Sequence, residues 1–286
     1  MSLLALTLVL TSAVLHASWN LLAKRSNGGA AFTWLFAALT AVIYAPVAVA
    51  FYVVMRPTLT LTHLGIIAVS SAIHVAYFLS LQRGYRAGDL SLVYPLARGT
   101  GPLLATVAAI LFLGERPTYL ALTGTALVVF SVFMLAGGFD TLRQTEDRRA
   151  TLYGLLTGFF IACYTVWDGY AVSVALIPPV LFFWLSEVIR ALMLLPVALQ
   201  NPAEVRREWL EHKREAIGIA VLSPLAYVLV LTALVFTPVS YVAPTREISI
   251  LIGTLFGARL LAEKDAARRL IAASGMVLGV ALLALN

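Results

Sequence analysis

Long stretches of apolar residues follow one another along almost the whole chain, separated by short polar turns. Most stretches are about 20 residues long, and a helix of that length spans the roughly 30 Å hydrocarbon core of a bilayer. The pattern predicts ten membrane-spanning helices, near residues 3–23, 30–55, 63–82, 90–113, 118–137, 151–172, 178–199, 216–236, 240–262 and 268–285. We therefore expect an all-α integral membrane protein.

Two connectors are predicted to be long and polar, Asp140 to Ala150 and Gln200 to Glu215. The first divides the chain into two halves of five predicted spans. The expected organisation is a first five-helix repeat at 1–138, a cytoplasmic connector at 139–150 and a second five-helix repeat at 151–286.

The two halves share a pattern of polar and aromatic residues inside their apolar stretches. Five positions recur 148 residues later, namely His16, Trp19, Asn20, Arg98 and Glu115 with Tyr164, Trp167, Asp168, Arg246 and Glu263. A copy with an odd number of spans must cross the membrane upside down relative to the other. We therefore predict two inverted five-helix repeats, an arrangement common among secondary transporters.

Composition supports a membrane protein, because 61% of the residues are hydrophobic and only 12% are charged. The net charge of +6 indicates basic cytoplasmic loops rather than nucleic-acid binding. The single cysteine, Cys163, excludes an internal disulfide, and the four scattered histidines predict no metal site. The sequence contains no nucleotide-binding or hydrolase motif, so we expect no enzyme and no cofactor.

Basic residues are concentrated in the connectors of one membrane side. That side carries fourteen of them, Lys24, Arg25, Arg83, Arg86, Arg143, Arg148, Arg149, Arg206, Arg207, Lys213, Arg214, Lys264, Arg268 and Arg269. The opposite connectors carry only Arg56 and Arg116. By the positive-inside rule the first set faces the cytoplasm, and both termini lie outside.

Several charged residues fall at bilayer depth, where a charge needs a partner or a polar cavity. Arg98 and Arg246 have two possible roles. They either form structural ion pairs that tie helices together, or they bind a solute anion through the paired hydrogen bonds of their guanidinium groups. Glu247 either neutralises Arg246 or holds an amine. Glu187 and Arg190, three residues apart, are expected to pair with each other.

Polar and aromatic residues at helical spacing complete the candidate substrate site. His16, Trp19 and Asn20 share one helix face, and they are either packing residues or site residues. His74 is a candidate proton carrier, with a simple packing role as the alternative. The full candidate set is His16, Trp19, Asn20, His74, Tyr77, Tyr94, Arg98, Tyr164, Trp167, Asp168, Tyr227, Arg246 and Glu247.

Three segments and their second copies resemble a known family: HASWN at 16–20, GDLSLVYPLARGTGPLL from 88 and LGERPT from 113. They are similar to EamA-type ten-helix members of the drug/metabolite transporter superfamily. The resemblance implies an exporter or exchanger in a bacterial inner membrane. Small four-helix relatives use a glutamate in the first helix for proton coupling, where this chain has His16 and Asn20. Plastid relatives hold phosphate with basic residues of the fourth and ninth helices, which here carry Arg98 and Arg246.

The expected function is therefore secondary transport of a small anionic or zwitterionic solute, such as an amino acid, an organophosphate or a phosphonate. Alternating access around a central cavity is the expected mechanism. One alternative is a proton-coupled exporter of cationic or aromatic drugs, with Asp168 and Glu247 as the cation site. A second is a non-transporting receptor or assembly subunit. The expected partners are the solute, membrane lipid and, for coupling, protons, with no nucleic acid.

The topology makes a testable prediction. In a Cys163→Ala background, a cysteine at position 2 should react with a membrane-impermeant thiol reagent in intact cells, whereas a cysteine at position 145 should not. Labelling at 145 with none at 2 means that the orientation is inverted.

Overall fold

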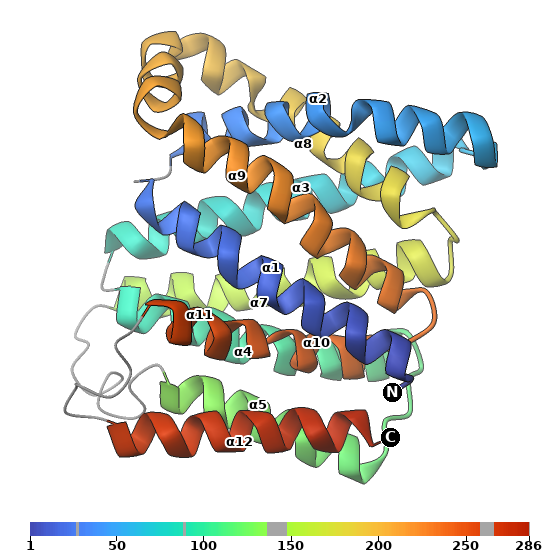
Figure 1. The fold of residues 1–286 in the computed structure, drawn as a ribbon, viewed down its shortest axis with the longest axis vertical. Coiled ribbons are helices and arrows are strands. Elements are labelled where there is room, and N and C mark those ends of the chain that lie inside the picture. Colours follow the sequence, from blue (N-terminus) through green and yellow to red (C-terminus); the bar gives the residue numbers. More distant parts are fainter. Residues whose placement is uncertain (27–28, 88–89, 136–147, 258–265, 286) are drawn as a thin grey trace.

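All regular structure in the described part of the chain is α-helical. The computed structural model describes residues 1–26, 29–87, 90–135, 148–257 and 266–285. The helices are α1 (Leu3–Arg25), α2 (Ala30–Met55), α3 (Leu61–Ala87), α4 (Leu90–Phe112), α5 (Tyr119–Leu135), α7 (Arg148–Ser173), α8 (Pro179–Gln200), α9 (Pro202–Leu234), α10 (Val239–Arg246), α11 (Ile248–Gly257) and α12 (Ala266–Ala284) (Figure 1). Most of the predicted connector at 139–150 lies outside the described residues.

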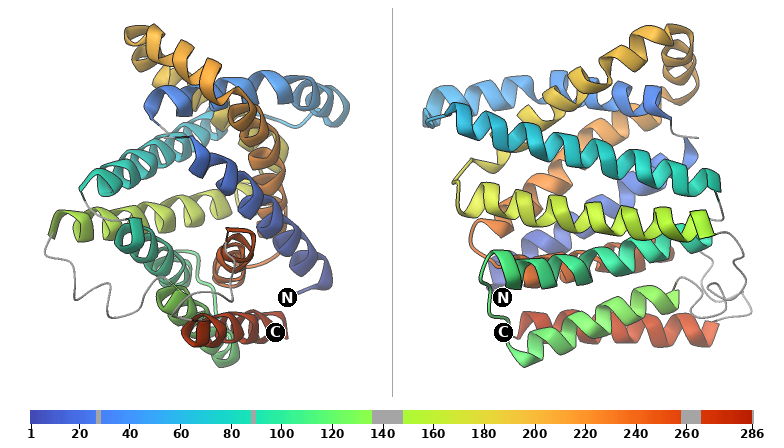
Figure 2. Two further views of the ribbon diagram at one scale, coloured as in Figure 1. Left: turned by 60° about the vertical axis from the view of Figure 1, so that its left-hand side comes forward. Right: turned by 180° about the vertical axis from the view of Figure 1, so that it is seen from behind.

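The helices lie side by side, with α2 and α8 at one end of the longest axis and α5 and α12 at the other (Figures 1 and 2). Between them, α1 packs against α9, and α7 packs against both α3 and α4. The two termini meet at one edge of the bundle, where the amino group of Met1 donates a hydrogen bond to the carbonyl of Ala284 at 3.2 Å. Both ends of the chain therefore lie on the same side.

Six helices in the described part of the chain, α1, α2, α3, α7, α8 and α9, are long and apolar enough to cross a membrane. Leu96–Phe112, Tyr119–Leu135 and Leu270–Ala284 are shorter apolar helices. A helix suits this environment because it satisfies its backbone hydrogen bonds internally, where no water is present. Many large apolar side chains, such as Leu3, Val54 and Phe112, are exposed on the bundle surface, as expected of helices that face lipid.

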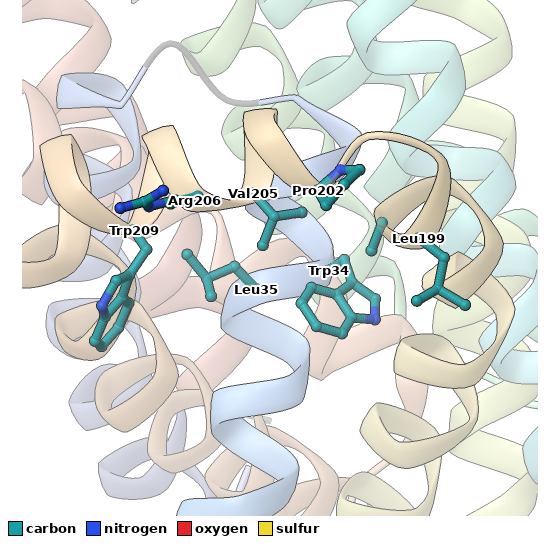
Figure 3. Close-up of a pocket in the computed structure, with 8 residues that line it drawn as sticks. Trp34, Leu35, Leu199, Pro202, Val205, Arg206 and Trp209 are labelled. Carbon is teal, nitrogen blue, oxygen red and sulfur yellow. The ribbon is translucent and has the colours of Figure 1, made fainter.

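The segment predicted as a polar connector, Gln200 to Glu215, is largely helical, because α9 already begins at Pro202. This segment is rich in strong helix formers, and proline is well tolerated in the first turn. The backbone leaves helical geometry at His212, where φ is −125° and ψ is 25°. The first part of α9 lies across α2, and a groove of about 360 Å³ lined by Trp34 and Trp209 runs between them (Figure 3). Charged residues had suggested a loop, but one apolar face makes the segment an amphipathic helix.

A sharp turn ends α4 and fixes the start of α10. Gly114 adopts a left-handed conformation with φ of 68°, which glycine accepts without steric cost. The carboxylate of Glu115 then accepts hydrogen bonds from the backbone N–H groups of Val239 at 2.7 Å and Ser240 at 2.9 Å. A carboxylate at a helix N-terminus is favoured by both the unpaired N–H groups and the helix dipole. Glu115 thus joins the first half of the chain to the second.

The predicted ninth span, 240–262, is broken in the structure. The helix α10 ends at Arg246, and α11 begins at Ile248, so that Glu247 occupies the break. Pro244 lies within α10, and a proline removes one backbone hydrogen bond of the helix. Breaks of this kind at membrane depth are tolerated where the freed groups are buried in protein or face a cavity.

The backbones of α5 and α12 approach each other closely. A Cβ atom at Gly124 would lie 2.7 Å from the carbonyl oxygen of Gly279, and one at Gly279 would lie 2.7 Å from that of Gly124. Two glycines therefore let these backbones touch, which is how membrane helices gain packing energy without a hydrophobic driving force.

Removing the Glu115 carboxylate should loosen α10. Glu115→Ala leaves two N–H groups without their acceptor, and we expect a loss of about 1–3 kcal/mol of stability. The measurement is the melting temperature of the purified protein in detergent, with Arg116→Ala as the neighbouring exposed control. Equal melting temperatures for the two variants would contradict a capping role.

Candidate functional site

The buried carboxylate of Asp168 is the centre of the site. Asp168 lies on α7 with no exposed surface, and its two oxygens accept hydrogen bonds from different helices. Ser70 on α3 donates to Oδ1, and Tyr227 on α9 donates to Oδ2, each at 2.6 Å. The Nε2 atom of His74, also on α3, lies 3.8 Å from Oδ2. A carboxylate at this depth requires such partners, because removal from water costs several kcal/mol.

Aromatic rings surround this carboxylate. The imidazole of His74 stacks on the ring of Tyr164 with centroids 4.2 Å apart and lies edge-on to Tyr227 at 5.9 Å. Tyr77 contacts Tyr164 edge-to-face at 5.6 Å. The Nδ1 atom of His74 lies 3.0 Å from the carbonyl oxygen of Ser70, which orients the ring. The four rings come from α3, α7 and α9, so most of the candidate residues predicted on these three spans lie together, with Trp167 as the exception.

Arg246 brings a positive charge to the same cluster. It is the last residue of α10 and is buried, and its Nη2 atom donates to the hydroxyl of Tyr164 at 3.4 Å. Tyr164 therefore contacts Arg246 through its hydroxyl and His74 through its ring. A continuous row runs from the guanidinium of Arg246 through Tyr164 and His74 to the carboxylate of Asp168.

Arg98 forms an ion pair with Glu247, across the boundary between the two halves. The Nε atom of Arg98 on α4 lies 3.0 Å from Oε2 of Glu247, and its Nη2 atom donates to the hydroxyl of Ser249 at 3.3 Å. Both charged side chains are buried, with relative exposures of 7% and 1%. Glu247 thus lies directly beside one arginine in sequence and is paired with the other in space.

Two charged residues of the break retain unused hydrogen-bonding capacity. Within the described part of the protein, the Nε atom of Arg246 makes no hydrogen bond, and neither do the carboxylate oxygens of Glu247, apart from the ion pair with Arg98. Buried polar atoms are normally satisfied, so an exception calls for an explanation such as water, an ion or a ligand. These atoms are therefore unsatisfied polar groups beside the Arg98–Glu247 ion pair.

The candidate residues of α1 lie beside this region. His16 and Trp19 contact each other edge-to-face at 4.8 Å, and the Asn20 amide donates to the His16 carbonyl within the same helix. The helix α1 packs against α10 and α11, and these two helices carry Arg246 and Ser249. The trio on α1 is therefore adjacent to the elements that carry part of the charged cluster.

The remaining candidates have mixed outcomes. The indole of Trp167 donates to the carbonyl of Ile66 at 2.9 Å, which is a helix-packing contact between α7 and α3. The side chain of Tyr94 lies outside the described part of the structure, as does Glu263. The predicted pairing of Glu187 with Arg190 is confirmed, at 2.7 Å.

Sequence reasoning missed Ser70 and Ser249, which bind the buried charges directly. Serine is common in membrane helices, where its hydroxyl usually bonds back to its own helix, so neither residue stood out. One signal was present for Ser70, because it lies four residues before His74 and therefore on the same helix face.

Comparisons with known proteins agree with a helical membrane-transporter fold. Residues 148–285 match the EamA-like transporter family, which is part of the drug/metabolite transporter superfamily. A solved crystal structure of a protein that is 16% identical shares the fold, with a TM-score of 0.74 and 98% of each chain covered. At this identity the likeness concerns the fold alone. No curated protein matches the sequence. The chain is thus an integral multi-pass membrane protein, and its family match indicates a transporter of small solutes.

The partners of Asp168 make a prediction about stability. Asp168→Asn keeps an oxygen that accepts from Ser70, and the Tyr227 hydroxyl can turn to accept from the amide, so we expect nearly unchanged folded yield. Glu187→Gln instead removes the charge partner of the partly buried Arg190, and we expect a loss of about 3 kcal/mol. Size-exclusion yield and melting temperature of both variants test this. A loss at Asp168→Asn as large as that at Glu187→Gln would make Asp168 a structural partner only.

Proposed function

From the match of residues 148–285 to the EamA-like transporter family, we propose that the protein is a secondary transporter of a small zwitterionic or anionic organic metabolite. It works as an exporter or exchanger. The observation that carries this proposal is the row of side chains from Arg246 through Tyr164 and His74 to Asp168, which joins a buried cation to a buried anion.

The balance of buried charge favours a zwitterion over a strongly anionic solute. Arg98 and Arg246 supply two positive charges, and Glu247 and Asp168 supply two negative charges. A solute such as an amino acid adds one charge of each sign and leaves this balance unchanged. An organophosphate would add uncompensated negative charge in a medium of low dielectric constant, where it costs the most.

The geometry suggests a role for each charge. The solute carboxylate binds the guanidinium of Arg246, whose Nε atom makes no hydrogen bond to the protein. The solute amine binds near Asp168, where the Ser70 and Tyr227 hydroxyls hold the carboxylate in place. The rings of Tyr77, Tyr164 and Tyr227 offer an apolar and polarisable wall for the solute side chain.

We further propose that the chain is built from two inverted five-helix repeats that rock about this site. The packing of α1 on α9 has a counterpart in the packing of α7 on α3, as exchange of the two halves requires. The contacts α2 with α8, α4 with α10 and α5 with α12 each join corresponding helices of the halves. Around a pseudo-twofold axis of this kind, transporters bind their solute near the midplane.

A second candidate function is a proton-coupled exporter of cationic or aromatic drugs. One observation favours it: the Asp168 carboxylate is surrounded by His74, Tyr164 and Tyr227, and aromatic rings around an anion suit a lipophilic cation. In this case Asp168 and Glu247 bind the cation, and Arg246 has no direct solute contact. The third alternative is a non-transporting receptor or assembly subunit. In such a protein the paired buried charges would serve only to hold the structure together.

A ligand screen with arginine variants distinguishes these functions. Amino acids, organophosphates and cationic dyes are tested for stabilisation of the purified protein, since a ligand of the folded state raises the melting temperature. If a zwitterion binds through the fork of Arg246, both Arg246→Lys and Arg246→Ala should weaken binding by about tenfold or more, because lysine loses the bidentate geometry.

The outcomes of this screen are distinct. Stabilisation by dyes alone, with unchanged affinity in both Arg246 variants, would replace the zwitterion proposal with the drug-exporter function. Asp168→Asn should abolish counterflow of the best ligand in proteoliposomes while the protein remains folded. Counterflow at the wild-type rate in this variant would remove Asp168 from the site.

A further inference from the structure

A second polar site lies at the end of the bundle that carries most of the basic residues. Arg83 and Arg86 near the end of α3 and Arg149 at the start of α7 line one groove of about 550 Å³. Ala87, Leu152 and Tyr153 form the rest of its lining. The groove is separate from the Asp168 cluster, because His74 lies more than two helical turns before Arg83 on α3.

Close helix packing holds the three guanidinium groups around this groove. Gly84 lies between Arg83 and Arg86, and a Cβ atom there would be 3.2 Å from Cβ of Tyr153 and 2.6 Å from Cγ1 of Val93. Glycine at this position therefore lets α3 approach α7 and α4 closely. Arg83 and Arg86, which flank this glycine on α3, therefore line the same groove as Arg149 on α7.

Three guanidinium groups line this one groove, so an anion bound there would contact positive charge from two helices. Arg83 and Arg86 are three residues apart and share one face of α3, where like charges are unfavourable. All three arginine side chains are exposed. A guanidinium group is well suited to phosphate, which accepts two parallel hydrogen bonds from it.

The surroundings of the groove favour a lipid as the source of that phosphate. The helices α3 and α7 are both long and apolar enough to span a membrane, and the arginines lie at their ends. A bilayer that these helices span would place its head groups beside the arginines. Leu152, which is 63% exposed, offers an apolar surface for an acyl chain. Basic pockets between membrane helices on the cytoplasmic side are known to hold anionic lipid head groups.

We propose that the groove of Arg83, Arg86 and Arg149 is a binding site for the phosphate head group of an anionic phospholipid. The positive-inside bias alone would give all basic residues of this side the same role. The proposed site distinguishes them, because Lys213 and Arg214 on α9 lie on the same predicted side and are also exposed but do not line the groove. This pair therefore provides a control with the same change of charge.

The test measures stabilisation of the full-length protein in detergent by added phosphatidylglycerol, with phosphatidylcholine as the neutral lipid and glycerol phosphate as the soluble anion. We expect saturable stabilisation by phosphatidylglycerol only. The double variant Arg83→Gln/Arg149→Gln should bind it about 25-fold more weakly, at about fivefold for each arginine. The control Lys213→Gln/Arg214→Gln should bind it within about twofold of the wild type. If the double variant does not fold, the single variant Arg86→Gln replaces it, with the expected loss of about fivefold.

Three results would overturn the proposal. Equal stabilisation by phosphatidylcholine would show that net charge of the head group is not recognised. An equal loss of affinity in the control variant would reduce the effect to general surface charge. Stabilisation by glycerol phosphate at the same concentration would assign the groove to a soluble phosphate instead of a lipid.

Discussion

The structure depends on one constraint, which is that a charge inside a bilayer must find its partners within the protein. Asp168 meets this constraint by accepting hydrogen bonds from Ser70 on α3 and Tyr227 on α9, and it therefore ties three helices together at one point. Arg98 meets it through Glu247, which ties α4 to the break between α10 and α11. In a bundle without a hydrophobic driving force between helices, such contacts and close backbone packing determine which helices are neighbours.

The broken helix follows from the same constraint. Its first part, α10, is only eight residues long. It begins where the Glu115 carboxylate accepts hydrogen bonds from two backbone N–H groups, and it ends at Arg246. Arg246 and Glu247 are neighbours at this break and contact different partners: Arg246 donates to Tyr164, and Glu247 pairs with Arg98. A turn at the edge of the bundle thus sets the position of charges deep inside it.

Much of this was predictable from the sequence, and the failures have physical causes. Apolar stretches long enough to span a bilayer located the helices, because only a helix satisfies its backbone there. Equal spacing in the two halves singled out Arg98, Arg246 and Asp168. The start of α9 was missed because its charged residues resemble a loop when the apolar face is ignored. The pairing of Arg98 with Glu247 was not predictable, since it depends on a helix break and on contact between residues that are 149 positions apart.

Several of the buried charge contacts join the two halves of the chain, whereas Tyr227 with Asp168, Arg246 with Tyr164 and Glu187 with Arg190 lie within the second half. Asp168 belongs to the second half, but Ser70 and His74 belong to the first; Glu247 and Arg98 are divided in the same way, as are Glu115 and α10. If the halves rock against each other, some of these contacts must break, and a charge left without a partner in lipid is costly. A solute that carries both an acid and an amine can take the place of the lost partners. A ligand shifts a conformational equilibrium only by its difference in affinity for the two states, and this replacement supplies such a difference. Under the proposed rocking motion, the contacts between the halves would therefore be the ones through which solute binding drives the movement.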